Sequence, residues 1–297
     1  MSNVLVELSN AMAAAAEKAG ESTVMVNARR RMPASGIAYA KDLILTADHV
    51  VEREEGINVT LSDGTENSAT LAGRDPGTDL ALLKLERANA KPAETAGGAK
   101  IGQLALALGR PSGEGIEASL GVVSAISGPV RTPRGMLDSY IRTDTTPFPG
   151  FSGGPLVDAD GNVIGLNTSG FGRGSSITIP ADLAWKVADQ LAKHGSIKRG
   201  YLGIRSQAVE VPAAGQKALK REQATGLVVL SVEKKSPAEA GGLMVGDILV
   251  GIDSQPVSDH DALFARLSGD VVGKSIPVEI LRGGQPQTLN VKIGERP

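Results

Sequence analysis

The sequence predicts a mainly β protein with two successive β-barrels and, after them, a smaller unit that mixes strands and helices. Short runs rich in β-branched residues recur along the chain and are separated by Gly, Pro, Asp or Asn. Such runs are typical of barrels or sandwiches, whereas parallel sheets alternate strands with longer helices. The 37 glycines and 16 prolines indicate many turns, and the low aromatic content of 3% leaves Val, Ile, Leu and Ala to form the core. A chain of 297 residues is long enough for two domains.

The predicted elements begin with an amphipathic helix over residues 4–19, within an N-terminal segment of residues 1–20. Its apolar residues at near-helical spacing are Val4, Leu5, Leu8, Met12 and Ala15, and they form a candidate association surface. The strands predicted for the first barrel are residues 22–28, 36–40, 43–46, 56–61, 68–73 and 80–85. Those predicted for the second barrel are residues 103–108, 119–127, 138–143, 155–158, 162–167 and 175–179.

A change of period marks the end of the barrels. Leu183, Val187 and Leu191 recur every fourth residue and Gly195 follows where a helix C-cap belongs, so we predict a closing helix over residues 181–194. The barrel domain is therefore predicted over residues 21–197 and the smaller domain over residues 198–297. The smaller domain is predicted to contain strands at residues 226–230, 246–253 and 275–282 and helices at residues 236–242 and 259–268.

Composition excludes several functions. The formal net charge is −2 and the one notable basic run is Arg29-Arg30-Arg31, which we interpret as a solvated strand or loop, so we expect no nucleic-acid partner. The chain has no cysteine, which excludes disulfides, thiolate metal sites and a cysteine nucleophile. Residues 1–20 have neither the basic start nor the continuous apolar run of a signal peptide or membrane span. We expect a cytoplasmic protein if Met1 is the natural start, and otherwise an exported or periplasmic protein whose leader is removed.

Three segments offer the groups of a serine nucleophile. Residues 150–156 read Gly-Phe-Ser-Gly-Gly-Pro-Leu, residues 46–49 read Thr-Ala-Asp-His, and residues 75–83 read Asp-Pro-Gly-Thr-Asp-Leu-Ala-Leu-Leu. A serine hydroxyl needs a histidine to take its proton and a carboxylate to hold that histidine in the right tautomer. Taken singly, His49 is equally a packed histidine, Asp79 a strand cap and Ser152 part of a Gly-rich hairpin. Together, in this order, they predict a catalytic triad in a cleft between two barrels.

These segments resemble the three active-site blocks of the trypsin-like serine proteases, and within them the HtrA (Deg-type) family. The resemblance covers the chain from about residue 20 and implies a trypsin-like double β-barrel followed by a small α+β PDZ domain. It implies that His49 is general base and acid, that Asp79 orients it and that Ser152 attacks the peptide carbonyl. The backbone amides of Gly150 and Ser152 are implied as the oxyanion hole.

The chain departs from the family just before the nucleophile. The family usually has Asn where this chain has Phe151, and the stretch here contains Pro147 and Pro149. The chemistry needs no particular side chain at position 151, but the prolines restrict the loop that must present the Gly150 amide. An intact protease and a silent or conditionally active peptide-binding or chaperone protein therefore both remain open.

The resemblance places four candidate substrate-binding residues. Thr146, six residues before the nucleophile, lies at the base of the primary pocket in that fold and carries no charge, so cleavage after Lys or Arg is not expected. Thr168, Ser169 and Gly170 follow a predicted strand and lie where the substrate backbone pairs, with Gly170 leaving space for a side chain. The expected preference is a small or medium apolar residue before the cut. A plain β-turn is the alternative for residues 168–170.

Two blocks in the smaller domain resemble a PDZ domain: Arg-Gly-Tyr-Leu-Gly-Ile at residues 199–204, and Ser-Pro-Ala-Glu-Ala-Gly-Gly-Leu leading to Val-Gly-Asp-Ile-Leu at residues 236–249. Such a domain binds a peptide C-terminus as an added strand. The implied carboxylate loop is Tyr201, Leu202 and Gly203, and the pairing strand starts at Ile204. The opposite wall is predicted to be a helix capped by Ser258, whose groove residues are His260, Phe264 and Leu267. The alternative, which is the commoner role of residues at this spacing, is one helix face in a small core with an exposed cap histidine.

The sequence therefore predicts an ATP-independent serine endopeptidase that needs no metal or cofactor and cleaves misfolded or exposed polypeptide segments. The PDZ domain is expected to capture peptide C-termini or to regulate the protease. An autoinhibited signalling protease that needs a PDZ ligand is a further alternative. The resemblance also implies a homotrimer, which the family forms through an N-terminal segment that carries aromatic residues; residues 1–20 here have none.

Overall fold

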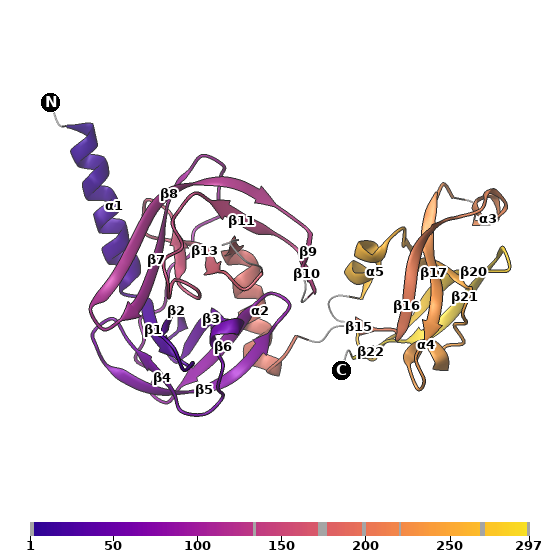
Figure 1. Ribbon diagram of the computed structural model, residues 1–297, viewed down its shortest axis with the longest axis horizontal. Helices are drawn as coiled ribbons and strands as arrows, with labels where there is room; N and C mark the ends of the chain where they lie inside the picture. The colour runs from indigo at the N-terminus through magenta and orange to yellow at the C-terminus, as the bar shows by residue number, and fades with distance from the viewer. Residues whose placement is uncertain are drawn as a thin grey trace. The chain divides into compact units, whose positions relative to one another are not determined.

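The computed structural model describes residues 3–132, 135–171, 177–197, 200–219, 221–267 and 271–295. Figure 1 shows two β-barrels in the first part of the chain, as the sequence predicted. Each barrel is closed by six antiparallel strands, in the orders β1-β2-β3-β6-β5-β4 and β11-β14-β13-β12-β7-β8. The first barrel consists of β1 (Thr23–Asn27), β2 (Ala34–Ala40), β3 (Leu43–Ala47), β4 (Ile57–Thr60), β5 (Glu66–Asp75) and β6 (Leu80–Leu85). The second consists of β7 (Leu104–Ser112), β8 (Gly115–Ser127), β11 (Tyr140–Thr143), β12 (Pro155–Val157), β13 (Val163–Thr168) and β14 (Ile177–Pro180).

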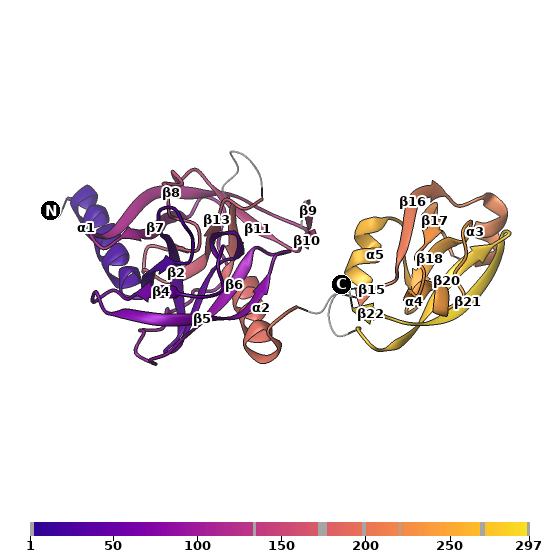
Figure 2. The same ribbon diagram turned by 60° about the horizontal axis from the view of Figure 1, so that its bottom comes forward.

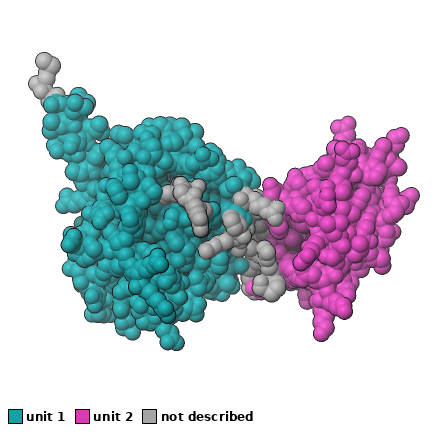
Figure 3. Space-filling model, viewed as in Figure 1, with its two compact units in different colours: residues 1–197 teal, residues 198–297 magenta. Residues whose placement is uncertain are grey.

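The chain divides into two compact units, residues 1–197 and 198–297, which are teal and magenta in Figure 3. Residue 198, where we placed the domain boundary, lies outside the described residues, as do residues 175 and 176 of the last predicted barrel strand and residue 268 of the last predicted helix.

The N-terminal helix α1 (Val4–Gly20) packs on the barrels through its second half only. Met12 and Ala15 are buried in the core that both barrels share, whereas Val4 and Leu5 are 72% and 74% exposed. Figure 1 shows the N-terminal end of α1 projecting beyond the barrels. The predicted association surface is therefore only partly free, because Met12 and Ala15 are used within the chain.

Short elements connect and close the barrels. The 3₁₀ turn η1 (Asp48–Val50) follows β3, and β9 (Val130–Thr132) pairs with β10 (Gly135–Leu137). Helix α2 (Ala181–His194) buries Ala184, Val187 and Leu191 and ends at Gly195, whose φ of 73° and N–H bond to the Leu191 carbonyl form the predicted C-cap.

The second unit is a small sheet with helices. Its strand order is β16-β17-β18-β20-β21, β19 pairs with β18, and β15 pairs separately with β22. Helix α5 lies beside the edge strand β16 in both Figure 1 and Figure 2. The strands are β15 (Gly200–Tyr201), β16 (Ile204–Glu210), β17 (Thr225–Val232), β18 (Ile248–Ile252), β19 (Gln255–Pro256), β20 (Ser275–Arg282), β21 (Gln285–Lys292) and β22 (Gly294–Glu295). The helices are α3 (Ala213–Leu219), α4 (Pro237–Ala240) and α5 (His260–Arg266).

Candidate active site

The histidine of the site, His49, lies in the 3₁₀ turn η1, which directly follows strand β3 of the first barrel. The His49 side chain is 20% exposed, and its Nδ1 is 2.7 Å from Asp79 Oδ2. The His49 backbone N–H donates to the other carboxylate oxygen, Asp79 Oδ1, at 2.9 Å. Two contacts to one carboxylate fix both the position of the turn and the plane of the ring. The other ring nitrogen is then left to face a nucleophile.

The carboxylate of Asp79 is buried and held by its own turn. Asp79 is 0% exposed and has a φ of 56°, a left-handed conformation that costs free energy for a residue other than glycine. Asp75 shapes the turn, because its carboxylate accepts from the backbone N–H of Gly77 and from the N–H and hydroxyl of Thr78. Asp79 also accepts a hydrogen bond from the Thr168 hydroxyl. The hydrogen bonds from the His49 backbone and from Thr168 hold the buried Asp79 carboxylate in place. Its Oδ2 atom is thereby kept against the imidazole of His49.

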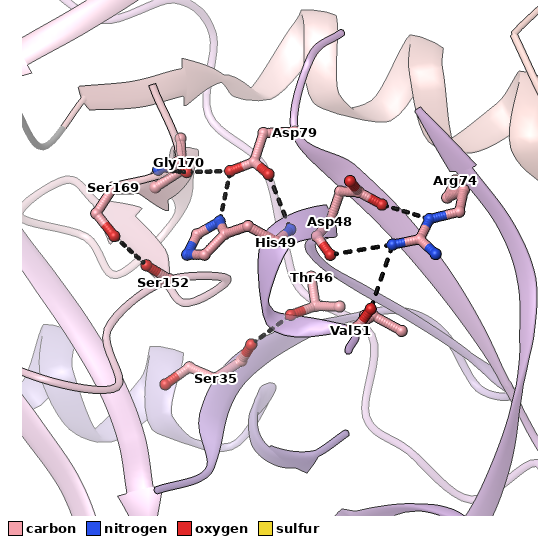
Figure 4. Close-up of polar contacts among 11 residues, drawn as sticks. Ser35, Thr46, Asp48, His49, Val51, Arg74, Asp79, Ser152, Ser169 and Gly170 are labelled. Carbon is pink, nitrogen blue, oxygen red and sulfur yellow. Dashed lines mark hydrogen bonds and ion pairs between the residues drawn. The ribbon is translucent and has the colours of Figure 1, made fainter. Parts of the chain in front are cut away.

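Ser152 precedes β12, and its hydroxyl faces the imidazole of His49 in Figure 4. Its Oγ is 3.1 Å from Ser169 Oγ, and among the described residues this is its hydrogen-bond partner. The backbone of the loop is tied to the first barrel, since the Ser35 N–H donates to the Ser152 carbonyl at 3.1 Å. The structure thus brings together His49, Asp79 and Ser152 as the sequence predicted, with the serine hydroxyl hydrogen-bonded to Ser169.

The loop before the nucleophile leaves two amides unused. Within the described part of the chain, the N–H groups of Gly150 and Ser152 donate to no other group, whereas the intervening Phe151 N–H donates to the Phe148 carbonyl at 3.1 Å. The Gly150 carbonyl accepts from the Ser35 hydroxyl at 2.7 Å, which fixes that side of the residue. Two unpaired amides beside a serine nucleophile are what an oxyanion hole requires.

Phe151 anchors this loop by hydrophobic burial. Its side chain is 2% exposed and packs with Ala107, Ile141 and Leu156 in a cluster of the second barrel. Its ring also meets the ring of Phe148 edge to face, with centroids 5.4 Å apart. The nucleophile loop is therefore attached to the second barrel by an apolar side chain.

We expect Phe151→Ala to lower the free energy of unfolding by about 3–5 kcal/mol, because it removes a fully buried ring. Phe148→Ala is the matched control: that ring is 42% exposed, so the expected cost is about 1 kcal/mol. Denaturant unfolding followed by the fluorescence of Trp185, the single tryptophan, reports the unit that contains the loop. Equal losses in the two variants would contradict the anchoring role.

A cavity of about 300 Å³ opens beside the nucleophile. It is lined by residues of the nucleophile loop, of both barrels and of the β1–β2 loop: Arg29, Met32, His49, Ala107, Thr145, Pro147, Phe148, Pro149, Gly150, Phe151, Ser152, Asn167, Thr168 and Ser169. The predicted substrate residues Thr168 and Ser169 belong to this lining. Thr146 does not belong to it, although its neighbours Thr145 and Pro147 do.

Gly170 serves the triad, and the prediction that it leaves space for a substrate side chain was wrong. A Cβ at this position would lie 2.2 Å from Asp79 Oδ2 and 2.9 Å from His49 Nδ1. The space beside its Cα is therefore filled by the Asp79–His49 pair. A side chain at position 170 would separate the two groups that must stay in contact.

We expect Gly170→Ala to lower kcat at least about a hundredfold, since displacement of a catalytic group by about 1 Å has that effect. The matched control is Gly97→Ala, because a Cβ on Gly97 would have nothing within 4 Å. Steady-state hydrolysis of a fluorogenic peptide gives kcat, and circular dichroism reports folding. A Gly170→Ala variant as active as Gly97→Ala would show that the pair tolerates the added methyl group.

One further side chain holds the histidine turn and was not predicted. Arg74 Nε is 2.6 Å from Asp48 Oδ1, and its Nη2 donates to the Val51 carbonyl at 3.2 Å (Figure 4). These bonds connect β5 to both ends of η1, the turn that carries His49. Nothing in the local sequence indicates which turn an arginine at this position reaches.

The predicted carboxylate loop of the second unit has free donors. The Leu202 carbonyl accepts from the Ala238 N–H and the Gly203 carbonyl accepts from the Glu233 N–H, but within the described residues the N–H groups of Leu202 and Gly203 donate to nothing. The Leu202 side chain is buried in the core, and the Tyr201 hydroxyl donates to Glu233. Ile204 begins β16, the edge strand of the sheet.

The predicted groove wall is partly corrected. His260 Nε2 lies 3.1 Å from both the hydroxyl and the carbonyl oxygen of Ser206 on β16, and Phe264 is half-buried. Leu267 is 6% exposed and packs in the core, so its assignment to the groove was wrong. The helix cap is Asp259, whose side chain accepts from the Ala262 N–H at 2.7 Å, and not Ser258.

Two further features bear on function. The described residues contain no group of three or more His, Cys, Asp or Glu side chains arranged to hold a metal ion. In the same part of the chain, no helix has both the length and the apolar character that crossing a membrane requires.

Known families match both units. Residues 34–166 match the family described as Trypsin-like peptidase domain, and residues 200–293 match the family described as PDZ domain. The protein named "Probable periplasmic serine endoprotease DegP-like" from Halomonas elongata is 38% identical over 278 residues, which cover 90% of this chain and 57% of that protein. A protein of the same name from Pseudomonas fulva is 38% identical over 272 residues, covering 89% of this chain and 56% of its own length. The chain thus spans little more than half the length of these curated relatives.

Solved structures match nearly from end to end. The structure named "HtrA-type protease AlgW with decapeptide" has a TM-score of 0.81 and 31% identity, and the match covers 96% of this chain and 99% of that chain. The serine endoprotease from Yersinia pestis has a TM-score of 0.80 and 30% identity over 96% of this chain and 98% of its own.

Proposed function

The chain belongs to the HtrA-type serine proteases, in which a trypsin-like peptidase domain precedes a PDZ domain, and we propose that it is an ATP-independent serine endopeptidase. The proposed substrates are misfolded or exposed polypeptide segments, because an extended backbone must enter the cavity. The observation that carries the proposal is the imidazole of His49, held by the buried Asp79 and facing the Ser152 hydroxyl (Figure 4). Curated relatives named as serine endoproteases support it.

In the proposed mechanism His49 transfers a proton twice, and two nucleophiles attack in succession: first Ser152 and then water. His49 Nε2 takes the Ser152 proton as Oγ attacks the peptide carbonyl, and Asp79 stabilises the imidazolium that forms. The amides of Gly150 and Ser152 bind the negative oxygen of the tetrahedral intermediate. His49 then gives the proton to the leaving amine, and water repeats the cycle on the acyl-enzyme.

The Ser152–Ser169 hydrogen bond favours a second candidate, a conditionally active or silent peptide-binding protein. In the structure the Ser152 hydroxyl is hydrogen-bonded to Ser169 Oγ, so this bond has to be given up before Ser152 can pass its proton to His49. One hydrogen bond between partly exposed hydroxyls contributes about 1 kcal/mol, which substrate binding readily overcomes. We therefore favour the active enzyme.

Substrate preference is proposed from the cavity. Ala107 and Phe148 give it apolar walls, and Thr145, the neighbour of the predicted Thr146, adds an uncharged polar group. A small or medium apolar residue before the cut fits these walls. Thr168 contributes indirectly, because its hydroxyl is committed to Asp79.

The second unit is proposed to bind peptide C-termini. β16 is the edge strand onto which a peptide would add, and the unused amides of Leu202 and Gly203 would hold its carboxylate. His260 and Phe264 of α5 form the opposite wall, and His260 is already hydrogen-bonded to Ser206 on the strand edge. A structure named as an HtrA-type protease with a decapeptide supports peptide binding in this family.

Assembly and location are further proposals. We propose an N-terminal segment over residues 1–20, a protease domain over 21–197 and a PDZ domain over 198–297. The exposed Val4, Leu5 and Leu8 of α1 provide an apolar surface for a homotrimer. A periplasmic location is proposed because the relatives are named as periplasmic.

Incubation with casein, an unfolded protein, tests the proposed function. We expect casein to be cut at internal bonds without added ATP, and sequencing of the new N-termini gives the residue before each cut. Cleavage only after addition of a C-terminal peptide would favour the conditionally active alternative. No cleavage with or without such peptides would contradict the endopeptidase.

A further inference from the structure

The cavity beside Ser152 contains a cation that the triad does not use. Arg29 belongs to the loop between β1 and β2 and lines the cavity together with His49 and Ser152. It is the first residue of the triple-arginine run, which the sequence indicated to be solvated. Arg30 and Arg31 are indeed exposed, whereas Arg29 is half-buried. Among the described lining residues, Arg29 is the one with a permanent charge.

The guanidinium of Arg29 is held by neutral groups. Its Nε donates to the Met32 carbonyl at 2.5 Å and its Nη2 to the Pro33 carbonyl at 3.1 Å. Among the described residues no carboxylate lies within ion-pair distance of it. Burial lowers the pKa of Arg29, and the more distant charge of Glu52 opposes that shift. The side chain therefore carries a fixed, partly desolvated charge with remaining N–H donors and no bound carboxylate.

The loop that carries this charge lies against the nucleophile loop. The Pro33 carbonyl that accepts from Arg29 lies 3.1 Å from where a Cβ on Gly150 would be, so the Arg29 loop touches the proposed oxyanion loop. Two residues later, Ser35 binds the carbonyls of both Gly150 and Ser152. A substrate backbone bound at Ser152 therefore brings its neighbouring side chains within reach of Arg29.

We propose that Arg29 is a specificity residue that binds a substrate carboxylate within a few residues of the cut bond. The inference rests on the proposed protease function and adds a substrate class to it: segments with an acidic group beside the apolar residue that enters the cavity. A planar guanidinium suits a carboxylate, since it offers paired N–H donors. The carboxylate comes from an Asp or Glu side chain or from the C-terminus of a short peptide.

Matched peptides test the proposal. Fluorogenic peptides built on a casein cut site carry Glu or Gln at each of the three positions on either side of the cut, with both ends blocked. We expect kcat/KM to be about fivefold to thirtyfold higher for Glu than for Gln at one or more positions, the range of a partly exposed charge-assisted hydrogen bond. A parallel series of Gln peptides that end in a free C-terminal carboxylate tests the chain end as the source of the carboxylate. If kcat/KM rises only in this series, Arg29 binds the C-terminus of the peptide and not a side chain.

Variants identify the residue responsible. The Glu/Gln ratio, taken within each variant so that a general loss of activity cancels, is expected to fall to about one in Arg29→Gln and to persist in Arg31→Gln, an exposed arginine of the same loop. Glu52→Gln is expected to raise the ratio, because it removes the opposing charge. A ratio near one throughout in the wild type, or a ratio that survives Arg29→Gln, would overturn the proposal. Absence of hydrolysis of every peptide would instead contradict the protease function itself.

Discussion

Replacing Ser152 by Ala is expected to lower kcat for peptide hydrolysis by about 10⁴- to 10⁶-fold, because it removes the nucleophile and leaves only binding and the oxyanion amides. Substrate affinity is expected to change little, since the alanine still lies in the same loop. The Ser35 N–H bond to the carbonyl of residue 152 involves the backbone and is kept. The measurement is kcat with the best casein-derived peptide, together with KM.

Ser169→Ala is the matched control for that prediction. It removes the hydroxyl that bonds Ser152 Oγ but leaves the nucleophile, so the expected change in kcat is about tenfold or less. If Ser152→Ala kept more than about one hundredth of wild-type kcat, a different residue would be the nucleophile. If Ser169→Ala were as inactive as Ser152→Ala, catalysis would depend on the Ser169 hydroxyl as much as on the nucleophile, which would contradict its use as a control.

Replacing Asp79 by Asn is expected to lower kcat by about 10⁴-fold, the loss known for this change in Ser-His-Asp triads. Asp79 Oδ2 accepts from His49 Nδ1 at 2.7 Å, and Oδ1 accepts from the His49 backbone at 2.9 Å. An amide has one acceptor oxygen, so it satisfies the backbone and presents its NH₂ group to Nδ1. The proton of the neutral imidazole then moves to Nε2, where the base is needed.

The control for Asp79→Asn is Asp48→Asn, in the same turn. Asp48 is also buried, but its carboxylate pairs with Arg74 and not with the imidazole. We expect this variant to lose some stability, because the buried Asp48 loses its charged pair with Arg74, which is 35% exposed and keeps Glu54 as a second partner, and to keep kcat within about tenfold. Thermal unfolding and kcat, measured for both variants, separate the two roles. Similar losses of kcat in both would mean that Asp79 acts by holding the turn.

The triad was predictable from sequence because each member lies in a short local block. A turn that ends a strand fixes His49, and an Asx-type turn fixes Asp79, so neighbouring residues carry the signal. The barrels were predictable for a similar reason, since strand alternation with Gly and Pro between runs is local. Thr146 and Gly170 were harder to interpret, because the direction that a loop residue faces depends on the barrel packed against it.

The elements that the sequence did not indicate lack a local signal. β21 is an edge strand whose residues are mostly exposed, so it has no apolar alternation to detect. Helix α3 contains Gly215, which disfavours a helix on its own. Its backbone packs closely against the rest of the second unit, since a Cβ there would lie 2.8 Å from the end of the Leu281 side chain. The roles of Arg29 and Arg74 also lack a local sequence signal, since their hydrogen-bond partners come from distant parts of the chain or from the backbone.

Labelling with a fluorophosphonate tests the central claim, a Ser152 activated by His49 and Asp79, most directly. The probe reacts with an activated serine and needs no knowledge of the natural substrate. We predict one covalent adduct, located on Ser152 by peptide mass spectrometry, which disappears in His49→Ala and Asp79→Asn and persists in Asp48→Asn. An unlabelled Ser152 in the wild type, with or without a C-terminal peptide bound to the second unit, would contradict the account.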